Sequence, residues 1–176
     1  MNGEHFKIMF KKVCIIGCGL IGSSIARGIK KNKLATKVVS SNRSNSTNKK
    51  VIRLKIVDEA SSNTKKIVEG SDLIIIASPL SSYKNIILKI KGSLNNGAIL
   101  TDVGSVKKNA IYLIEKNIPN NVSWISSHPI AGTEESGPES GFSELFKNKW
   151  CILTPSKKSK NKDIKSLKNF WKNLEV

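Results

Sequence analysis

Two stretches of this 176-residue chain combine residue types and spacings that can do chemistry. The first is GCGLIG at residues 17–22, between an apolar run and a segment with helical periodicity. A helix that begins at such a turn offers unpaired N–H groups and a partial positive charge to a phosphate. Gly17 would permit the tight turn, Gly19 would let the backbone approach a pyrophosphate, and Gly22 would let the helix pack on the strand. The pattern predicts a dinucleotide site, and the alternative is the same turn with no ligand.

The second stretch is SHPIAGTEESGPESGF at residues 127–142, which contains His128 directly after an expected strand. Imidazole can transfer protons near neutral pH, and hydride transfer from a C–OH centre needs a group that accepts the hydroxyl proton. The other histidine, His5, falls in an expected tail. From the residues alone, His128 is equally well explained as a capping or hydrogen-bonded loop histidine. Glu134, in the same loop, either tunes His128 or is a solvated charge.

Ser105 is a further candidate with two interpretations. It follows TDVG at residues 101–104, and we expect a helix to begin at Ser105 itself. A serine at a helix start is commonly an N-cap, which is the simpler interpretation. The alternative is that Ser105 holds a ligand oxygen or orients His128 from across a crevice.

The elements that must position these residues alternate between strand and helix along the chain. The consecutive apolar residues Leu73–Ile76 are typical of a strand buried on both faces of a parallel sheet. We expect strands at residues 12–16, 37–41, 56–57, 73–76, 98–102, 122–125 and 150–153, and helices at 20–31, 46–54, 64–68, 80–91, 105–116 and 162–173. This order predicts an α/β fold of the Rossmann type, a doubly wound, mainly parallel sheet with helices on both faces. Residues 1–10 are expected to be a tail and residues 11–176 a single NAD(P)-binding domain.

In doubly wound sheets, ligands bind beyond the carboxyl ends of the strands. The loops expected there are therefore the candidate cofactor site. The residues that we expect to bind the dinucleotide from these loops are Gly17, Gly19, Leu20, Ile21, Gly22, Ser41, Asn42, Arg43, Ser44, Ser78, Pro79, Asp102 and Gly104.

The charge balance is strongly basic, with 30 lysines and arginines against 13 acidic residues and a net charge of +17. Such a balance raises nucleic acid as a partner. The lysines, however, are spread along the chain, and no basic stripe is interleaved with aromatic residues. We therefore expect no nucleic-acid partner, and interpret the positive field as an attraction for an anionic cofactor and substrate.

The apolar pattern and the cysteines exclude other classes. No apolar run approaches the roughly 20 residues of a bilayer-spanning helix, so we expect no membrane association and a cytoplasmic location. Cys14, Cys18 and Cys151 have no metal-ligand spacing, so we expect buried thiols and no metal site.

Taken together, GCGLIG, DVGSVK at residues 102–107, the His128 loop and KNKWCILTP at residues 147–155 resemble the nucleotide-binding domain of the prephenate and arogenate dehydrogenase family. The likeness extends from about residue 11 to residue 176. HPIAGTE with an upstream DVGSVK is specific to that family. The resemblance implies NAD(P)-dependent oxidative decarboxylation of prephenate or arogenate, a small-molecule substrate on the route to tyrosine.

The resemblance also implies a role for each residue of the loops. His128 would accept the proton of the ring hydroxyl as hydride leaves the same carbon, and loss of carbon dioxide would make the ring aromatic. Ser105 would hydrogen-bond the substrate hydroxyl and His128. Glu134 would lie in the substrate pocket, and Thr133 near the nicotinamide.

The family continues into a helical domain that dimerises and supplies an arginine for a substrate carboxylate, whereas this chain stops at Val176. Either the chain is a fragment or a separate polypeptide completes it, and a homodimer is expected only with the helical domain. We expect the 176 residues to bind dinucleotide but to turn over prephenate poorly or not at all. The alternatives are another Rossmann dehydrogenase or imine reductase of small acids, and a non-catalytic dinucleotide-binding module.

The loop expected after the second strand bears on the cofactor. Sites that prefer NAD place an acidic residue there, which binds the ribose hydroxyls. This chain has Ser41, Asn42, Arg43 and Ser44 instead. A carboxylate would repel a 2′-phosphate, whereas Arg43 with Ser41 or Ser44 could bind one through charge-assisted hydrogen bonds. We therefore favour NADP over NAD.

Overall fold

The computed structural model describes residues 8–106 and 108–176, in which strands and helices alternate. The strands are β1 (Phe10–Ile16), β2 (Ala35–Ser41), β3 (Glu59–Ser61), β4 (Leu73–Ile76), β5 (Ile99–Asp102), β6 (Ser123–Pro129) and β7 (Cys151–Pro155). The helices are α1 (Leu20–Lys31), α2 (Asn45–Arg53), α3 (Thr64–Val68), α4 (Tyr83–Ile90), α5 (Lys108–Asn117) and α6 (Asn161–Lys172), with a short 3₁₀ helix η1 (Leu80–Ser82) before α4.

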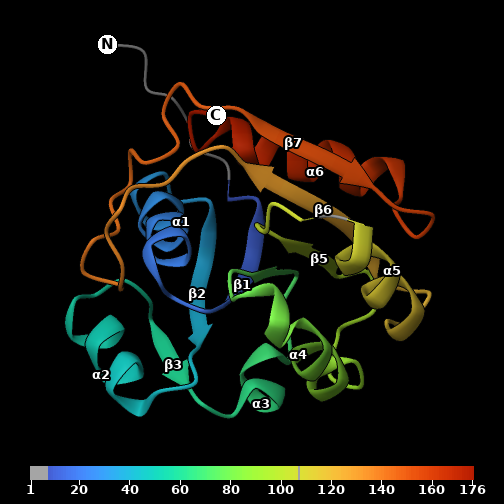
Figure 1. Ribbon diagram of the computed structural model, residues 1–176, viewed down its shortest axis with the longest axis horizontal. Helices are drawn as coiled ribbons and strands as arrows, with labels where there is room; N and C mark the ends of the chain where they lie inside the picture. The colour runs from blue at the N-terminus through green and yellow to red at the C-terminus, as the bar shows by residue number, and fades with distance from the viewer. Residues whose placement is uncertain (1–7, 107) are drawn as a thin grey trace.

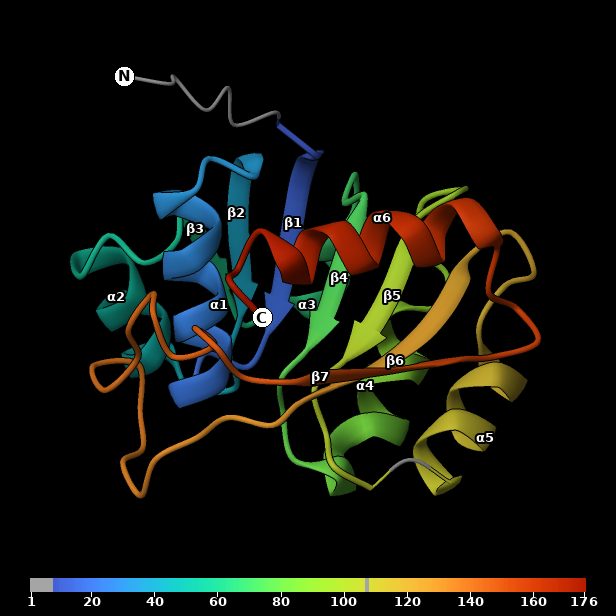
Figure 2. The ribbon, with the colours of Figure 1, turned by 90° about the horizontal axis from the view of Figure 1, so that it is seen from above.

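These strands form one sheet in the order β3-β2-β1-β4-β5-β6-β7 (Figure 1). Every pairing from β3 to β6 is parallel, and β7 pairs antiparallel with β6. Helices α1 and α6 cover one face, and α3, α4 and α5 cover the other (Figure 2). The predicted Rossmann-type fold, a doubly wound, mainly parallel sheet with helices on both faces, is confirmed.

The sheet carries an apolar core on each face. In β4, Leu73 and Ile75 pack into the core under α1 and α6, while Ile74 and Ile76 pack into the core under α3, α4 and α5. All four side chains have no exposed surface. The uninterrupted apolar run of β4 thus reflects burial on both faces, as predicted.

Several predicted boundaries were wrong. Phe10, assigned to the tail, begins β1 and packs edge-on against Phe170. The third strand was expected at residues 56–57 but lies at Glu59–Ser61, because Ile56 and Val57 are buried in the turn that follows α2. Residues 1–7, with His5, lie outside the described part of the chain.

Two further differences affect the site. Strand β6 continues to Pro129 because β7 pairs with its second half, from Ile125 to Pro129. Helix α5 begins at Lys108 rather than at Ser105. Across residues 8–106 and 108–176, no helix is both long enough and apolar enough to cross a bilayer.

Candidate functional site

The glycine-rich turn joins β1 to α1, and its glycines meet different surroundings. Gly17 has a φ of +99°, and a Cβ there would lie 2.5 Å from Ser78 Oγ. A Cβ at Gly22 would lie 2.0 Å from the carbonyl oxygen of Gly17. Around a Cβ at Gly19, by contrast, no atom outside Gly19 and its two chain neighbours lies within 4 Å. The turn and packing roles of Gly17 and Gly22 are confirmed, and Gly19 faces open space as a ligand contact requires.

The N-terminus of α1 suits an anion. Gly19 is the N-cap residue of α1 and has no side chain to accept the first N–H groups of the helix. The first turn of α1 contains no acidic residue. The positive end of the helix is therefore available to a phosphate.

A cleft of about 720 Å³ lies at the carboxyl ends of β1, β2 and β4. No carboxylate lines it among the described residues, and Arg43 and Lys89 are the cationic side chains in its lining. The predicted cofactor residues that line the cleft are Gly17, Gly19, Ser41, Asn42, Arg43, Ser44, Ser78 and Pro79.

Asn42 ties the glycine-rich turn to β2 and α2. Its carbonyl oxygen Oδ1 accepts a hydrogen bond of 2.7 Å from the N–H of Cys18. Its amide nitrogen Nδ2 donates to Ser40 Oγ at 3.1 Å and to Asn48 Oδ1 at 3.0 Å. Asn42 is buried, so its side chain positions the turn.

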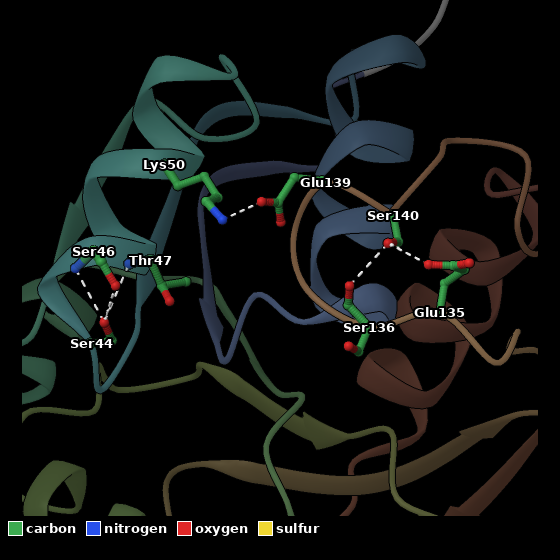
Figure 3. Close-up of polar contacts among 8 residues, drawn as sticks. All are labelled: Ser44, Ser46, Thr47, Lys50, Glu135, Ser136, Glu139 and Ser140. Carbon is green, nitrogen blue, oxygen red and sulfur yellow. Dashed lines mark hydrogen bonds and ion pairs between the residues drawn. The ribbon is translucent and has the colours of Figure 1, made fainter.

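The serines on either side of Asn42 and Arg43 also have partners within the protein. The hydroxyl of Ser41 shares a hydrogen bond of 2.7 Å with Thr64 Oγ1. The hydroxyl of Ser44 caps α2 by accepting from two backbone N–H groups of its first turn, at 3.1 and 3.4 Å (Figure 3). Arg43, between Asn42 and Ser44, is exposed and lines the cleft. It is therefore the residue of this loop best placed to recognise a ligand by charge.

The remaining predicted cofactor residues do not line the cleft: Leu20, Ile21, Gly22, Asp102, Gly104 and Thr133. Asp102 departs most from its predicted role, because its carboxylate has no exposed surface. It accepts hydrogen bonds from Tyr83 Oη at 2.9 Å, from Ser126 Oγ at 2.5 Å and from the N–H of Gly104 at 3.1 Å. The pKa of Tyr83 is raised mainly by burial, and also by the charge of Asp102 and by the hydrogen bond between these two side chains. Asp102 thus joins β5, β6 and α4 internally, and its buried carboxylate points to a structural role rather than to the predicted cofactor contact.

The predicted catalytic residues lie at the carboxyl ends of the neighbouring strands β5 and β6. His128 is half-buried within β6, opposite Ile152 of β7, rather than in a loop after the strand. Ser105 is exposed between β5 and α5, three residues before Lys108, the first residue of the helix. Glu134 and Thr133 are exposed in the segment after β6, where Thr133 Oγ1 accepts from the N–H of Glu135 at 3.2 Å. These side chains do not line the cleft described above.

Other lining residues were missed from sequence: Thr47, Ser62, Thr64, Ser81, Ser82, Asn85, Ile86, Lys89, Gly137 and Pro138. The lining residues from η1 and α4 recur at helical spacing. This spacing indicates that they share one face of the helix, but it does not indicate what that face contacts. Gly137 and Pro138 form a Gly-Pro turn signal far along the chain. Nothing local indicates that this turn returns to α2. Within the described residues, no cluster of three or more His, Cys, Asp or Glu side chains is arranged to hold a metal ion.

Comparison with known proteins decides the family. A family model for the nucleotide-binding domain of prephenate dehydrogenase matches residues 25–176. The chain belongs to this family. The resemblance noted from sequence is thereby confirmed over a region that begins within α1, just beyond the glycine-rich turn.

The chain is also similar to individual members of the prephenate dehydrogenase family. It is 32% identical to a cyclohexadienyl dehydrogenase of Zymomonas mobilis over 94% of this chain and 56% of that protein. A solved prephenate dehydrogenase of Aquifex aeolicus, in complex with hydroxyphenyl propionate and NAD+, aligns with a TM-score of 0.85 and 30% identity over 93% of this chain and 57% of that chain. The arogenate dehydrogenase of Synechocystis aligns with a TM-score of 0.86 and 27% identity over 94% and 57%. The chain spans about half the length of the curated relatives it matches.

Proposed function

We propose that this chain binds NAD(P) in the cleft and forms the cofactor half of an enzyme that oxidatively decarboxylates prephenate or arogenate. The observation that carries the proposal is the open space at Gly19, at the N-terminus of α1, in a chain that belongs to the prephenate dehydrogenase nucleotide-binding family. A pyrophosphate fits there because the backbone can approach it and no acidic side chain opposes it. Titration of the chain with NADPH and NADH tests the proposal, and failure to bind either would overturn it.

The proposed chemistry divides between the cofactor and the residues of β5, β6 and the segment after β6. Bound NAD(P) supplies the hydride acceptor. His128 takes the proton of the ring hydroxyl, and loss of carbon dioxide then makes the ring aromatic. Ser105 hydrogen-bonds the same hydroxyl and holds the imidazole toward it. Glu134 lies beside the substrate, and Thr133 lies toward the nicotinamide.

The test of His128 uses a protein that includes the remaining half of its relatives' length. His128→Asn keeps a polar side chain of similar size but removes the base. It should keep the Kd for NADPH and lower kcat by about 10²- to 10⁴-fold. An unchanged kcat would favour a non-catalytic binding module or a different base.

We further propose that the preferred cofactor is NADP. Arg43 is the exposed cation of the loop after β2, and no carboxylate lines the cleft among the described residues. A guanidinium binds a 2′-phosphate through charge-assisted hydrogen bonds, and the N-terminus of α2 adds its partial positive charge. The Aquifex relative was solved with NAD+, so the preference is a property to be measured on this chain.

The Arg43→Ala variant tests this preference. It should raise the Kd for NADP about tenfold or more and the Kd for NAD less than about twofold, because only NADP carries the group that the guanidinium binds. Lys49→Ala is the matched control, because it removes an exposed charge from α2, the helix that follows Arg43, without altering the lining of the cleft. A large preference of the unaltered chain for NAD would overturn the proposal.

A further inference from the structure

Residues 130–150, here called the strap, join β6 to β7 by a long detour. Antiparallel neighbours can be joined by a two-residue turn. In Figures 1 and 2 the strap instead leaves β6, runs past α1 as far as α2, and returns to β7. Long connections without helices or strands of their own are uncommon in compact domains and are usually functional.

The returning half of the strap is fixed to α1. The N–H of Phe142 donates to Ser24 Oγ at 3.0 Å. A Cβ at Gly141 would lie 2.1 Å from Ser23 Oγ, so the strap backbone lies directly against the helix. Glu144 forms an ion pair of 2.5 Å with Lys31. These contacts hold the strap beside α1 without involving the cleft.

The tip of the strap, residues 135–140, reaches the cleft and α2. Gly137 and Pro138 line the same cleft as Arg43 and Ser44, and Gly137 has a φ of +89° that a residue with a side chain would adopt only under strain. The tip is closed on itself, because Ser140 Oγ donates to the carbonyl oxygen of Ser136 at 2.9 Å (Figure 3).

One ion pair joins this tip to α2. Glu139 pairs with Lys50, which lies on the helix that Ser44 caps (Figure 3). The hydrogen bond from Lys50, with that from the backbone N–H of Glu139 itself, lowers the pKa of Glu139. The carboxyl group of Glu139 therefore stays ionised near neutral pH. Lys50 itself does not line the cleft.

We propose that Lys50 and Glu139 act as a clasp that holds Gly137 and Pro138 over the dinucleotide, so that Lys50 is a positioning residue and not a cofactor contact. The inference rests on the proposed function, since it assumes that the cleft binds the dinucleotide. An open tip would remove one wall of the cleft and release the ligand, so the clasp acts mainly on dissociation. The same strap carries Thr133 and Glu134, and the clasp thereby links the cofactor side of the protein to the segment proposed to face the substrate.

The first test compares two neighbouring lysines of α2 in the 176-residue chain. Lys50→Met and Lys49→Met each remove one positive charge from the helix, but only the first breaks the contact with the strap. Lys50→Met should raise the Kd for NADPH about three- to fivefold, mostly through a faster dissociation rate, and Lys49→Met less than twofold, as befits a single exposed ion pair. Fluorescence titration and stopped-flow displacement measure both quantities. Equal effects of the two substitutions would overturn the proposal.

Glu139→Gln separates a clasp from a direct contact. If Lys50 bound a cofactor phosphate, removing the competing carboxylate would leave NADPH affinity unchanged or raise it. The clasp predicts the same loss as in Lys50→Met, with no further loss in the double variant. Exchanging the charges, Lys50→Glu with Glu139→Lys, should recover most of the affinity. Binding by Glu139→Gln that equals or exceeds that of the unaltered chain would overturn the clasp.

The unaltered chain separates the two proposals. If it binds neither NADPH nor NADH, the proposed function fails and the clasp fails with it. If it binds and the clasp variants bind equally well, the clasp alone fails. Thermal unfolding should leave each variant within about 2 °C of the unaltered chain, because exposed ion pairs contribute little to stability.

Discussion

At the scale of single residues, the three glycines of the turn differ in whether a Cβ would collide with the rest of the protein. Gly17 and Gly22 meet backbone or side-chain atoms where a Cβ would stand, while Gly19 meets none. The motif in the sequence marks all three positions alike. Only the packing distances show that Gly17 and Gly22 are required by the fold, whereas Gly19 has open space, where we propose that the dinucleotide binds.

Gly19→Ala and Gly22→Ala should therefore behave in opposite ways. Gly19→Ala should change the free energy of unfolding by less than about 1 kcal/mol, because φ is −78° and the methyl group meets no atom. It should still weaken NADPH binding about tenfold or more, since the methyl group occupies the path of the pyrophosphate. Gly22→Ala should unfold the protein or cost more than about 3 kcal/mol. Urea denaturation and NADPH titration check both, and unaltered binding by Gly19→Ala would contradict the placement of the pyrophosphate.

Asp102 gives a second prediction at this scale. Asp102→Ala leaves the donors of Tyr83, Ser126 and Gly104 without their common acceptor, the first two of them buried. The free energy of unfolding should fall by about 2 to 4 kcal/mol, measured by urea denaturation. Asp102→Asn keeps an acceptor and nearly the same shape, so its loss should be smaller. A negligible loss in Asp102→Ala would show that the network does not stabilise β5 and β6.

At the scale of elements, local pattern predicted most of the sheet. The apolar run of β4 and the periodicity of α1 and α6 depend on neighbours in sequence, and these elements lie where they were expected. The end of β6 depends instead on pairing with β7, a contact between distant parts of the chain, so His128 was misplaced into a loop. Ile56 and Val57 show that burial alone does not make a strand.

The path of the strap is the part of the fold that the sequence analysis predicted least, because the strap has no hydrophobic periodicity. Its attachment to α1 is nevertheless measurable through Glu144. The hydrogen bond from Lys31, assisted by those from Ser143 and the backbone N–H of Glu144, lowers the pKa of Glu144 to about 2. A carboxyl group with a lowered folded pKa stabilises the attachment fully above its ordinary value, about 4.5, and loses that contribution as the pH falls toward 2.

The titration of Glu144, followed by carboxyl carbon NMR, checks this attachment. In the unaltered chain its midpoint should lie well below the ordinary glutamate value, and in Lys31→Met it should move back toward that value. Glu139, whose partner is Lys50, should be unaffected by Lys31→Met and serves as the internal control. An unmoved midpoint for Glu144 would show that the ion pair does not persist in solution.

At the scale of the whole molecule, the chain carries a net charge of +17, and among the described residues no carboxylate lines the cleft. Raising the salt concentration from about 0.05 M to about 0.5 M should raise the Kd for NADPH several-fold, because salt screens the field that attracts an anion. The Kd for NADH should rise less, since NADH lacks the 2′-phosphate. Arg43→Ala should make the salt dependence of the Kd for NADPH more similar to that of the Kd for NADH. Equal salt dependence of NADPH and NADH binding in the unaltered chain would contradict a phosphate site at Arg43.

The hydrogen bonds of Asn42 also limit how cofactor choice can change by mutation. Asparagine and aspartate differ by one base in either of their codons, so Asn42→Asp is the shortest genetic step toward the acidic residue typical of NAD sites. At Asn42, however, that step would remove both hydrogen bonds that Nδ2 donates and would place a carboxylate against two side-chain oxygens in a buried position. Under the proposed function, Arg43, which is exposed and lines the cleft, is the position where a substitution could exchange one cofactor for the other while Asn42 keeps the β1–α1 turn intact.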